Sequence, residues 1–440
     1  MKYKLRSLLT LFFILFLLTP DAAVHSLPVA TPREVGFSEV RLSRINQVVQ
    51  GYVDEQKIAG AITLIARKGK LAHFQIFGMM DIESRKPMQP DTIFRIASMT
   101  KPITTVALMM LYEEGRLLLS DPVSKYLPEF KNPQVLVINK EKDANPSPYK
   151  LVPANKSITI HHLLTHTSGI TYTFQGSPYI SDMYKKAGVS DGLSQTEGTI
   201  AQQVEKLAKM PLCHQPGEGF DYGLGIDVAG RLVEVISGMT LDNFFHERIF
   251  KPLKMKDTYF FLPDEKVSRL ASLYQQTKDG KLEKYTDEPV EQELLKYSAS
   301  YPYLGEKKYY SGGAGLVSTA EDYWRFLQLL LNGGQLDGTR LLSRKTVEYM
   351  ASNHIGDTVM WNSPFDGYRF GLGFAVRTDV GTSAKIGSVG EYTWGGFFST
   401  TFWVDPKEQM IGIMLIQLRP NEQLDIHDKF KVLAYQAIDN

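Results

Sequence analysis

Two pairs of β-rich runs stand near opposite ends of this 440-residue chain. Residues 61–66 and 71–77 flank a turn that contains Gly69, and residues 400–404 and 410–416 flank a turn that contains Pro406. Short β-rich runs on either side of a turn predict hairpins. We expect these hairpins, although far apart in sequence, to share one sheet in an α/β lobe.

The region between the hairpins is predicted to be mostly helical or irregular. Its helical segments are residues 158–164, 200–209, 225–237 and 241–250. The predicted fold class is therefore α/β (α+β), with an antiparallel sheet flanked by helices. Residues 33–130 and 311–440 would form the α/β lobe, and residues 131–310 an inserted, mainly helical lobe. Polar residues 131–157 and about 275–310 predict long loops that line a pocket or, as the default, are solvated insertions.

The first residues predict an export signal. A basic start at residues 2–6 precedes an apolar run at residues 8–18, broken only by Thr10, and the small residue Ser26 follows Ala22-Ala23-Val24-His25. This apolar run is too short to span a bilayer comfortably. We therefore expect residues 1–26 to be a signal peptide and the mature protein to be periplasmic or secreted, with no stable membrane insertion. An uncleaved anchor is the alternative.

Composition excludes several classes of partner and cofactor. The chain has 49 basic and 48 acidic residues, so its formal charge is +1 and nothing points to nucleic acid or to an acidic membrane surface. With Cys213 as its single cysteine, it forms no intrachain disulfide. The nine histidines show no metal-ligand spacing and the glycines form no phosphate loop, so we expect no metal and no cofactor.

Ser98 and Lys101 are the strongest catalytic candidates. Apolar residues 103, 106, 107, 110 and 111 recur at helical spacing after them, and Pro102 is tolerated only in a helix's first turn, so a helix is predicted to start close to Ser98. There the hydroxyl would lie beside an amine that can take its proton, with free backbone N–H groups nearby. The alternative is that Ser98 is only a helix cap and Lys101 a solvated charge.

A serine–lysine pair needs a second proton carrier, because the leaving group must be protonated as the serine is acylated. Tyr222 is the candidate. It stands in the glycine-rich segment 216–225, just before the predicted helix 225–237, so its phenol could project from a loop. It is one of 22 tyrosines, and the pattern alone leaves a core or surface position open.

Five sequence blocks, taken in order, resemble the serine β-lactamase-like superfamily. They are residues 98–104, 163–169, 216–225, 312–322 and 394–396. The segment from about residue 35 to residue 435 is similar to the class C branch and, within it, to the family VIII carboxylesterases. Five blocks in the same order are very unlikely to arise by accident, so the resemblance supports a β-lactamase/transpeptidase-like fold.

The resemblance implies roles for individual residues. Ser98 matches the acylated nucleophile, Lys101 the base that activates it, and Tyr222 the partner that relays protons. The backbone N–H groups of Ser98 and Phe397 would form the oxyanion hole. His166 matches a structural loop histidine, with a role as the base the less favoured alternative.

Two departures from the β-lactamase pattern bear on the substrate. Leu224 replaces an asparagine, and Trp394 replaces a lysine or histidine on the strand Trp394-Gly395-Gly396. Losing both polar groups forfeits charge-assisted hydrogen bonds of roughly 1.5–3 kcal/mol each, which disfavours penicillins and peptide C-termini relative to neutral esters. The resemblance places Trp394, Gly395, Gly396 and Leu224 against the substrate, although Trp394 and Leu224 could instead be packing residues.

The sequence therefore predicts an exported serine hydrolase that cleaves small-molecule carboxylic esters through an acyl-enzyme on Ser98, with transesterification possible. One alternative is a β-lactamase or a D-alanyl-D-alanine carboxypeptidase on the same fold. The other is a non-catalytic envelope protein that keeps the scaffold.

Overall fold

The computed structural model describes residues 27–139, 147–292, 294–360, 366–421 and 424–439. The predicted signal peptide, residues 1–26, lies outside the described residues. Across the part of the chain that is described, none of the helices combines the length and the apolar character needed to cross a bilayer.

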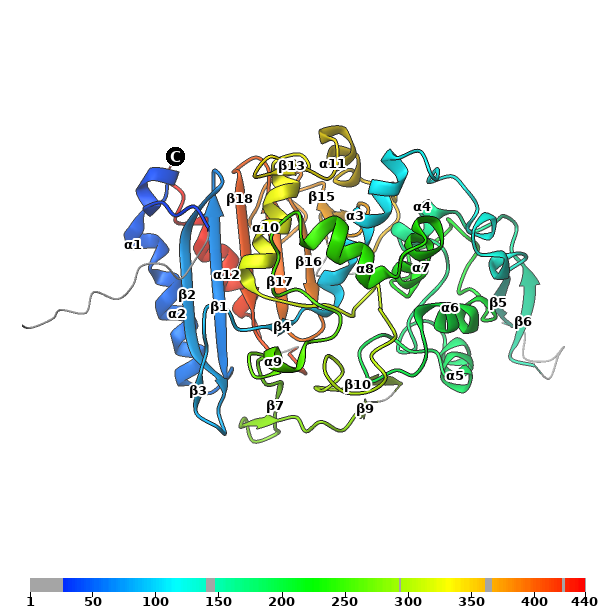
Figure 1. Cartoon of the computed structure of the whole chain (residues 1–440), viewed down its shortest axis with the longest axis horizontal. Coiled ribbons are helices and arrows are strands. Elements are labelled where there is room, and N and C mark those ends of the chain that lie inside the picture. Colours follow the sequence, from blue (N-terminus) through cyan, green and yellow to red (C-terminus); the bar gives the residue numbers. More distant parts are fainter. Residues whose placement is uncertain (1–26, 140–146, 293, 361–365, 422–423, 440) are drawn as a thin grey trace, which may run out of the picture.

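An antiparallel eight-stranded sheet joins the two ends of the chain, in the order β14-β15-β16-β17-β18-β1-β2-β3 (Figure 1). The strands are β1 Gly60–Arg67, β2 Lys70–Asp81, β3 Lys86–Pro87, β14 Tyr368–Phe370, β15 Ala375–Arg377, β16 Tyr392–Gly396, β17 Thr400–Asp405 and β18 Met410–Leu415. The N-terminal and C-terminal hairpins meet where β1 pairs with β18, Leu64 opposite Ile413. The prediction that the two hairpins share a sheet is confirmed.

Helices cover both faces of this sheet, which explains why β1 and β18 are buried along their whole length. Alternate side chains of a strand point to opposite faces. Leu64 belongs to one core, which includes residues of α10 (Ala320–Leu331), and Ile65 to a second core with α2 (Arg44–Asp54) and α12 (Ile426–Tyr435). Two-sided burial therefore explains why these two strands are apolar along most of their length.

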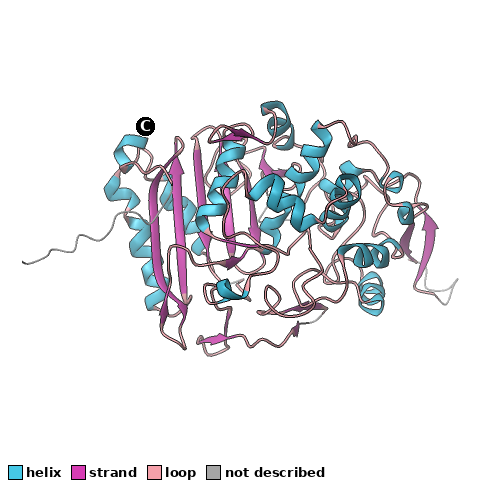
Figure 2. Ribbon diagram, in the orientation of Figure 1, coloured by secondary structure: helices cyan, strands magenta, loops and turns pink. Residues whose placement is uncertain are grey.

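Figure 1 shows α4 to α8 gathered on the side of the sheet away from α2, and Figure 2 shows the same region as a group of helices. The remaining helices are α1 Glu39–Leu42, α3 Thr100–Glu113, α4 Ile160–Leu164, α5 Pro178–Ala187, α6 Ile200–Ala208, α7 Gly225–Ser237, α8 Leu241–Phe245, α9 Asp264–Val267 and α11 Arg344–Met350. α3 packs against α7 and so joins the sheet region to the helical region. The helices predicted at 158–164, 200–209 and 225–237 are present, and the one predicted at 241–250 continues from α8 into a π-helical turn at His246–Phe250.

The two predicted long loops contain short hairpins. Their strands are β5 Gln134–Ile138 with β6 Tyr149–Pro153, β7 Tyr274–Gln276 with β8 Leu282–Lys284, and β9 Val290–Gln292 with β10 Leu295–Tyr297. The sequence prediction missed them because these strands are short, lie in polar segments, and expose apolar residues such as Val137, Ile138 and Leu151, so buried and exposed positions do not follow the apolar pattern. The boundaries of the two predicted lobes stay a prediction.

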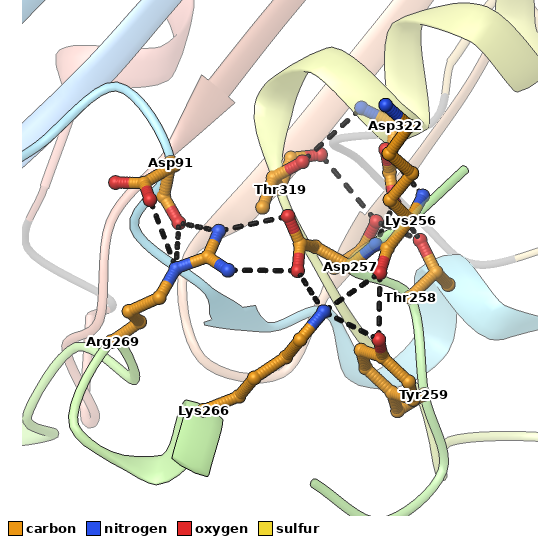
Figure 3. Close-up of polar contacts among 10 residues, drawn as sticks. Asp91, Lys256, Asp257, Thr258, Tyr259, Lys266, Arg269, Thr319 and Asp322 are labelled. Atoms are coloured by element: carbon orange, nitrogen blue, oxygen red, sulfur yellow. Dashed lines mark hydrogen bonds and ion pairs between the residues drawn. The ribbon is translucent and has the colours of Figure 1, made fainter. Parts of the chain in front are cut away.

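A cluster of hydrogen bonds and ion pairs connects α10 to residues 256–259, which follow α8 in the chain (Figure 3). The Asp257 carboxylate accepts hydrogen bonds from Lys266 at 2.6 Å and from Arg269 at 2.8 Å. Asp322, 5% exposed, accepts from the backbone N–H of Asp257 at 2.7 Å and from the Thr258 hydroxyl at 2.8 Å. Burial raises the pKa of Asp322 to about 6, against the effect of these donors.

Candidate active site

Ser98 lies where an extended segment turns into α3. The 3-10 turn Ala97–Met99 precedes the helix, which begins at Thr100, so Lys101 occupies its first turn. Ala97 has a left-handed backbone with φ of 42°, an uncommon conformation for a residue with a side chain. Ser98 is partly exposed, whereas Lys101 is fully buried. The predicted start of the helix beside Ser98 is confirmed.

The Lys101 amine is held by three neutral oxygen atoms. Nζ donates to Ser98 Oγ at 3.1 Å, to the Tyr172 hydroxyl at 2.8 Å and to the Gly313 carbonyl at 2.8 Å. Burial, reinforced by the neighbouring Tyr222, holds the pKa of Tyr172 well above its usual value, so this phenol remains uncharged. The amine therefore faces the serine hydroxyl with its orientation set from two other sides.

Tyr222 lies over the same amine. Lys101 Nζ is 4.5 Å from the centroid of the Tyr222 ring, and the Tyr222 hydroxyl accepts a hydrogen bond from Trp394 Nε1 at 3.3 Å. The Tyr172 ring lies 5.3 Å from the Tyr222 ring. The structure thus brings together Ser98, Lys101 and Tyr222, which come from segments more than 120 positions apart, and adds Tyr172 to the group.

His166 holds the loop that carries Tyr222. Its Nδ1 accepts the Gly223 N–H at 3.2 Å, its carbonyl accepts the Asp221 N–H at 2.8 Å, and its ring lies 4.7 Å from the Tyr222 ring. Burial keeps the pKa of His166 well below its usual value, so the ring is neutral and Nδ1 can accept. A Cβ at Gly223 would lie 2.4 Å from the Ile170 carbonyl oxygen, so this close packing requires glycine.

A cavity of about 620 Å³ opens in front of Ser98 and runs along β16. The predicted site residues on its wall are Ser98, Tyr222, Trp394, Gly395, Gly396 and Phe397. Leu224 is not brought to this wall: its side chain is 1% exposed and packs in the core below the loop. The structure therefore shows Leu224 as a packing residue of the helix start.

Gly396 allows the end of β16 to approach the segment that leads to Ser98. A Cβ at this position would lie 2.4 Å from the Ile96 carbonyl oxygen and 2.2 Å from Thr400 Oγ1. A side chain would therefore push the strand away from the serine. The oxyanion hole formed by the backbone N–H groups of Ser98 and Phe397 stays a prediction.

The cavity also reaches charged side chains near α12. Lys385 forms an ion pair with Asp428 at 2.8 Å, and Lys431 is paired with the buried Glu391. Within the described residues, no group of three or more histidine, cysteine or acidic side chains could hold a metal ion.

Sequence reasoning missed two partners of Lys101. Tyr172 lies three positions after the block 163–169, and Gly313 lies inside the block 312–322. The position of Tyr172 close to one block, and of Gly313 inside another, was the only sequence signal that could have pointed to them. Neither position has a local pattern that separates it from the other tyrosines and glycines, because their role depends on contacts across the fold.

The sequence pattern of the beta-lactamase family matches residues 45–437. The chain belongs to the beta-lactamase family. It is 34% identical to Protein Rv1367c of Mycobacterium tuberculosis over 84% of this chain and 89% of that one. Esterase EstB of Burkholderia gladioli is 30% identical over 82% of this chain and 87% of its own length. The solved structure of EstCE1, described as a hydrolase with promiscuous acyltransferase activity, matches with a TM-score of 0.78 and 29% identity, covering 90% of this chain and 99% of that one.

These matches establish the β-lactamase/transpeptidase-like fold, and relatives at about 30% identity include esterases and acyltransferases.

Proposed function

We propose that this protein is a serine hydrolase that cleaves carboxylic esters through an acyl-enzyme on Ser98. One observation carries the proposal: the fully buried Lys101 amine lies 3.1 Å from the Ser98 hydroxyl, at the wall of a cavity large enough for a small ester. Export of the mature protein is part of the proposal and rests on the sequence of residues 1–26.

In the first half-reaction Lys101 acts as the free amine: its two N–H groups donate to Tyr172 and Gly313, and its lone pair accepts the Ser98 proton as Oγ attacks the ester carbonyl carbon. The carbonyl electron pair moves to its oxygen, where the N–H groups of Ser98 and Phe397 would stabilise the negative charge. When the carbonyl re-forms, the alcohol oxygen departs with the bonding electrons and takes a proton relayed through Tyr222 from the Lys101 ammonium. The products are the acyl-serine and the free alcohol.

In the second half-reaction, water gives up a proton to the same relay and attacks the acyl carbon. Collapse returns the electron pair and a proton to Ser98 Oγ and releases the carboxylic acid. An alcohol that replaces this water would yield a new ester instead. Acyl transfer is thus the same chemistry with a different acceptor, and similarity to acyltransferases supports it as a second activity.

The cavity wall favours neutral esters over β-lactams. Trp394 presents an indole where a β-lactamase would offer a cation, and Phe174 and Leu193 add further apolar surface. The loss of the charge-assisted hydrogen bond at this position, worth roughly 1.5–3 kcal/mol, corresponds to a preference of at least ~10-fold. Similarity to EstB and to a lovastatin esterase of Penicillium rubens also supports a preference for esters.

The decisive experiment compares the wild type with Ser98→Ala in hydrolysis of p-nitrophenyl butyrate and in labelling by a fluorophosphonate, read by intact-protein mass. We expect Ser98→Ala to abolish both while the thermal midpoint stays near that of the wild type. Ser147→Ala is the matched control, because Ser147 also precedes a lysine by three positions but lies outside the site. Retained activity in Ser98→Ala contradicts the proposal, because another group would then be the nucleophile. A wild type that is neither active nor labelled favours a non-catalytic scaffold.

Parallel assays separate the rival activities. Nitrocefin turnover faster than ester turnover, or release of D-alanine from a D-alanyl-D-alanine peptide, would identify a β-lactamase or carboxypeptidase. Product analysis with 1-butanol as acceptor measures the share of acyl groups transferred rather than hydrolysed.

A further inference from the structure

Asp227 is a buried carboxylate close to the proposed base but outside the cavity wall. It lies in the first turn of α7, five positions after Tyr222, and is 2% exposed. Its Oδ1 accepts hydrogen bonds from the Tyr309 hydroxyl at 2.9 Å and from Ser311 Oγ at 2.7 Å. Burial raises the pKa of Asp227, whereas Ser311, the charge of Lys101 and Tyr309 favour its carboxylate form.

The other carboxylate oxygen lies against the backbone that orients Lys101. A Cβ at Gly313 would be 2.4 Å from Asp227 Oδ2, and the Gly313 carbonyl accepts the Lys101 hydrogen bond at 2.8 Å. α3 makes a second contact with this segment, from the Thr104 hydroxyl to the Gly312 carbonyl at 2.6 Å. Asp227 on α7 and the residues of α3 therefore hold the segment 309–313 together.

Asp227 is also a source of negative charge for an amine whose hydrogen-bond partners are neutral. The other titratable groups around the carboxylate are Tyr309, Tyr172 and Asp191. The pKa values of Tyr309 and Tyr172 are held well above their usual value by burial, so both remain uncharged. Burial raises the pKa of Asp191 to about 7, although Thr173 donates to it, so this acid is partly protonated near neutral pH.

We propose that Asp227 is a positioning residue for Lys101: its carboxylate holds residues 309–313 against the amine and stabilises the ammonium that forms when Ser98 loses its proton. The inference rests on the proposed function. A buried ammonium without a nearby negative charge is strongly disfavoured, and charges interact more strongly in a protein interior than in water. Asp227 acts through Lys101 and does not contact the substrate cavity.

Asp227→Asn tests this role, because the amide preserves the shape and an acceptor oxygen but removes the charge. We expect kcat for p-nitrophenyl butyrate to fall about 10- to 100-fold with KM within about twofold, less than the ~10²–10⁴-fold contribution of a group that itself transfers the proton. The acidic limb of kcat/KM against pH should move to lower pH, because the ammonium form of residue 101 loses a negative neighbour. Ser311→Ala, which keeps the charge, should lower kcat less and leave this limb in place.

Asp322→Asn is the matched control. Asp322 is a similarly buried carboxylate with hydroxyl and N–H donors, but it lies in the α10 cluster outside the cavity (Figure 3). This variant should lose stability while keeping the wild-type pH profile. If Asp227→Asn behaves in the same way, with an unmoved acidic limb and activity lost only in proportion to the folded fraction, the role is structural and the proposal is overturned.

Should Asp227→Asn fail to fold, Ser311→Ala and Tyr309→Phe carry the test, since each removes one hydroxyl donor from the carboxylate. A fall in kcat of about three- to tenfold at constant KM is expected for each, the size expected for loss of one ordinary hydrogen bond. Unchanged kcat in both contradicts the proposal. Failure of the proposed function itself is distinguishable, because the wild type would then neither turn over esters nor label at Ser98.

Discussion

Lys101 and Lys431 are both buried, 0% and 8% exposed, but their surroundings differ. Lys431, on α12, is paired with the carboxylate of Glu391, which also accepts hydrogen bonds from the hydroxyls of Tyr368 at 2.8 Å and Tyr435 at 2.9 Å. Lys101, on α3, has only a hydroxyl, a phenol and a carbonyl as hydrogen-bond acceptors at these distances.

The comparison separates a structural lysine from a chemically useful one. Burial lowers the pKa of Lys431, but the contacting Glu391 carboxylate opposes this and keeps the proton in a closed ion pair. Losing either member leaves an uncompensated buried charge. The carboxylate near Lys101 is that of Asp227, which lies beside Gly313, and the Gly313 carbonyl accepts the Lys101 hydrogen bond. The Lys101 nitrogen can therefore exchange a proton with Ser98 and still be stabilised when charged.

The largest effect should come from Lys101→Met, which fills the same space without an amine. We expect kcat/KM for p-nitrophenyl butyrate to fall at least ~1000-fold, because the nucleophile loses its base. Steady-state kinetics together with a thermal unfolding curve check this. A folded variant that retains more than about a tenth of wild-type activity would show that another group removes the Ser98 proton.

Glu391→Gln should affect stability rather than chemistry. The substitution leaves the Lys431 ammonium buried beside a neutral amide, so we expect the free energy of unfolding to fall by about 3 kcal/mol or more. Urea unfolding followed by circular dichroism measures this loss, and ester turnover at 25 °C should stay within about twofold. A variant as stable as the wild type would mean that Lys431 can lose its proton or reach solvent.

The two tyrosines near Lys101 should differ in effect. Tyr222→Phe removes the proposed proton relay and should lower kcat about 100-fold or more. Tyr172→Phe removes one hydrogen bond to the amine and should lower kcat about tenfold, in line with a bond to a charged group. Steady-state kinetics of both variants with the same ester test whether Tyr222→Phe causes the larger loss of kcat. A larger loss in Tyr172→Phe would transfer the relay role to that residue.

The smallest effect concerns the loop before Tyr222, where His214 Nε2 lies 3.1 Å from the Asp221 carboxylate. Burial alone would lower the pKa of His214, but Asp221 and the Gln215 carbonyl raise it above its usual value. The stabilisation should therefore be complete below about pH 6.5, the unperturbed histidine value, and disappear as the pH rises through the higher folded-state value.

Asp221→Asn should remove that pH dependence, with a stability difference from the wild type of up to about 1 kcal/mol at pH 6, since the pair is partly exposed. Thermal unfolding of both proteins from pH 5.5 to pH 9 measures the difference, which should shrink toward high pH. A difference that stays constant over this range would exclude a charged His214.

Much of the fold could be predicted because the relevant signals are local. β-rich runs on either side of a turn predicted the hairpins β1–β2 and β17–β18. Pro102 marked the start of α3, since a proline fits only in a helix's first turn. The short hairpins between residues 131 and 310 were missed, because several of their apolar residues are exposed and their burial does not follow a regular two-residue repeat.

The sequence by itself determined the serine–lysine spacing at a helix start, the Tyr222 loop and a sheet built from both ends of the chain, because these follow from neighbouring residues and from motif order. Only the tertiary structure decided which groups surround the Lys101 amine. Tyr172, Gly313 and Asp227 reach it from segments 71 to 212 positions away, and Leu224 turned inward to the core. Such contacts depend on how α3, α7 and residues 309–313 pack together, and no local pattern encodes that packing.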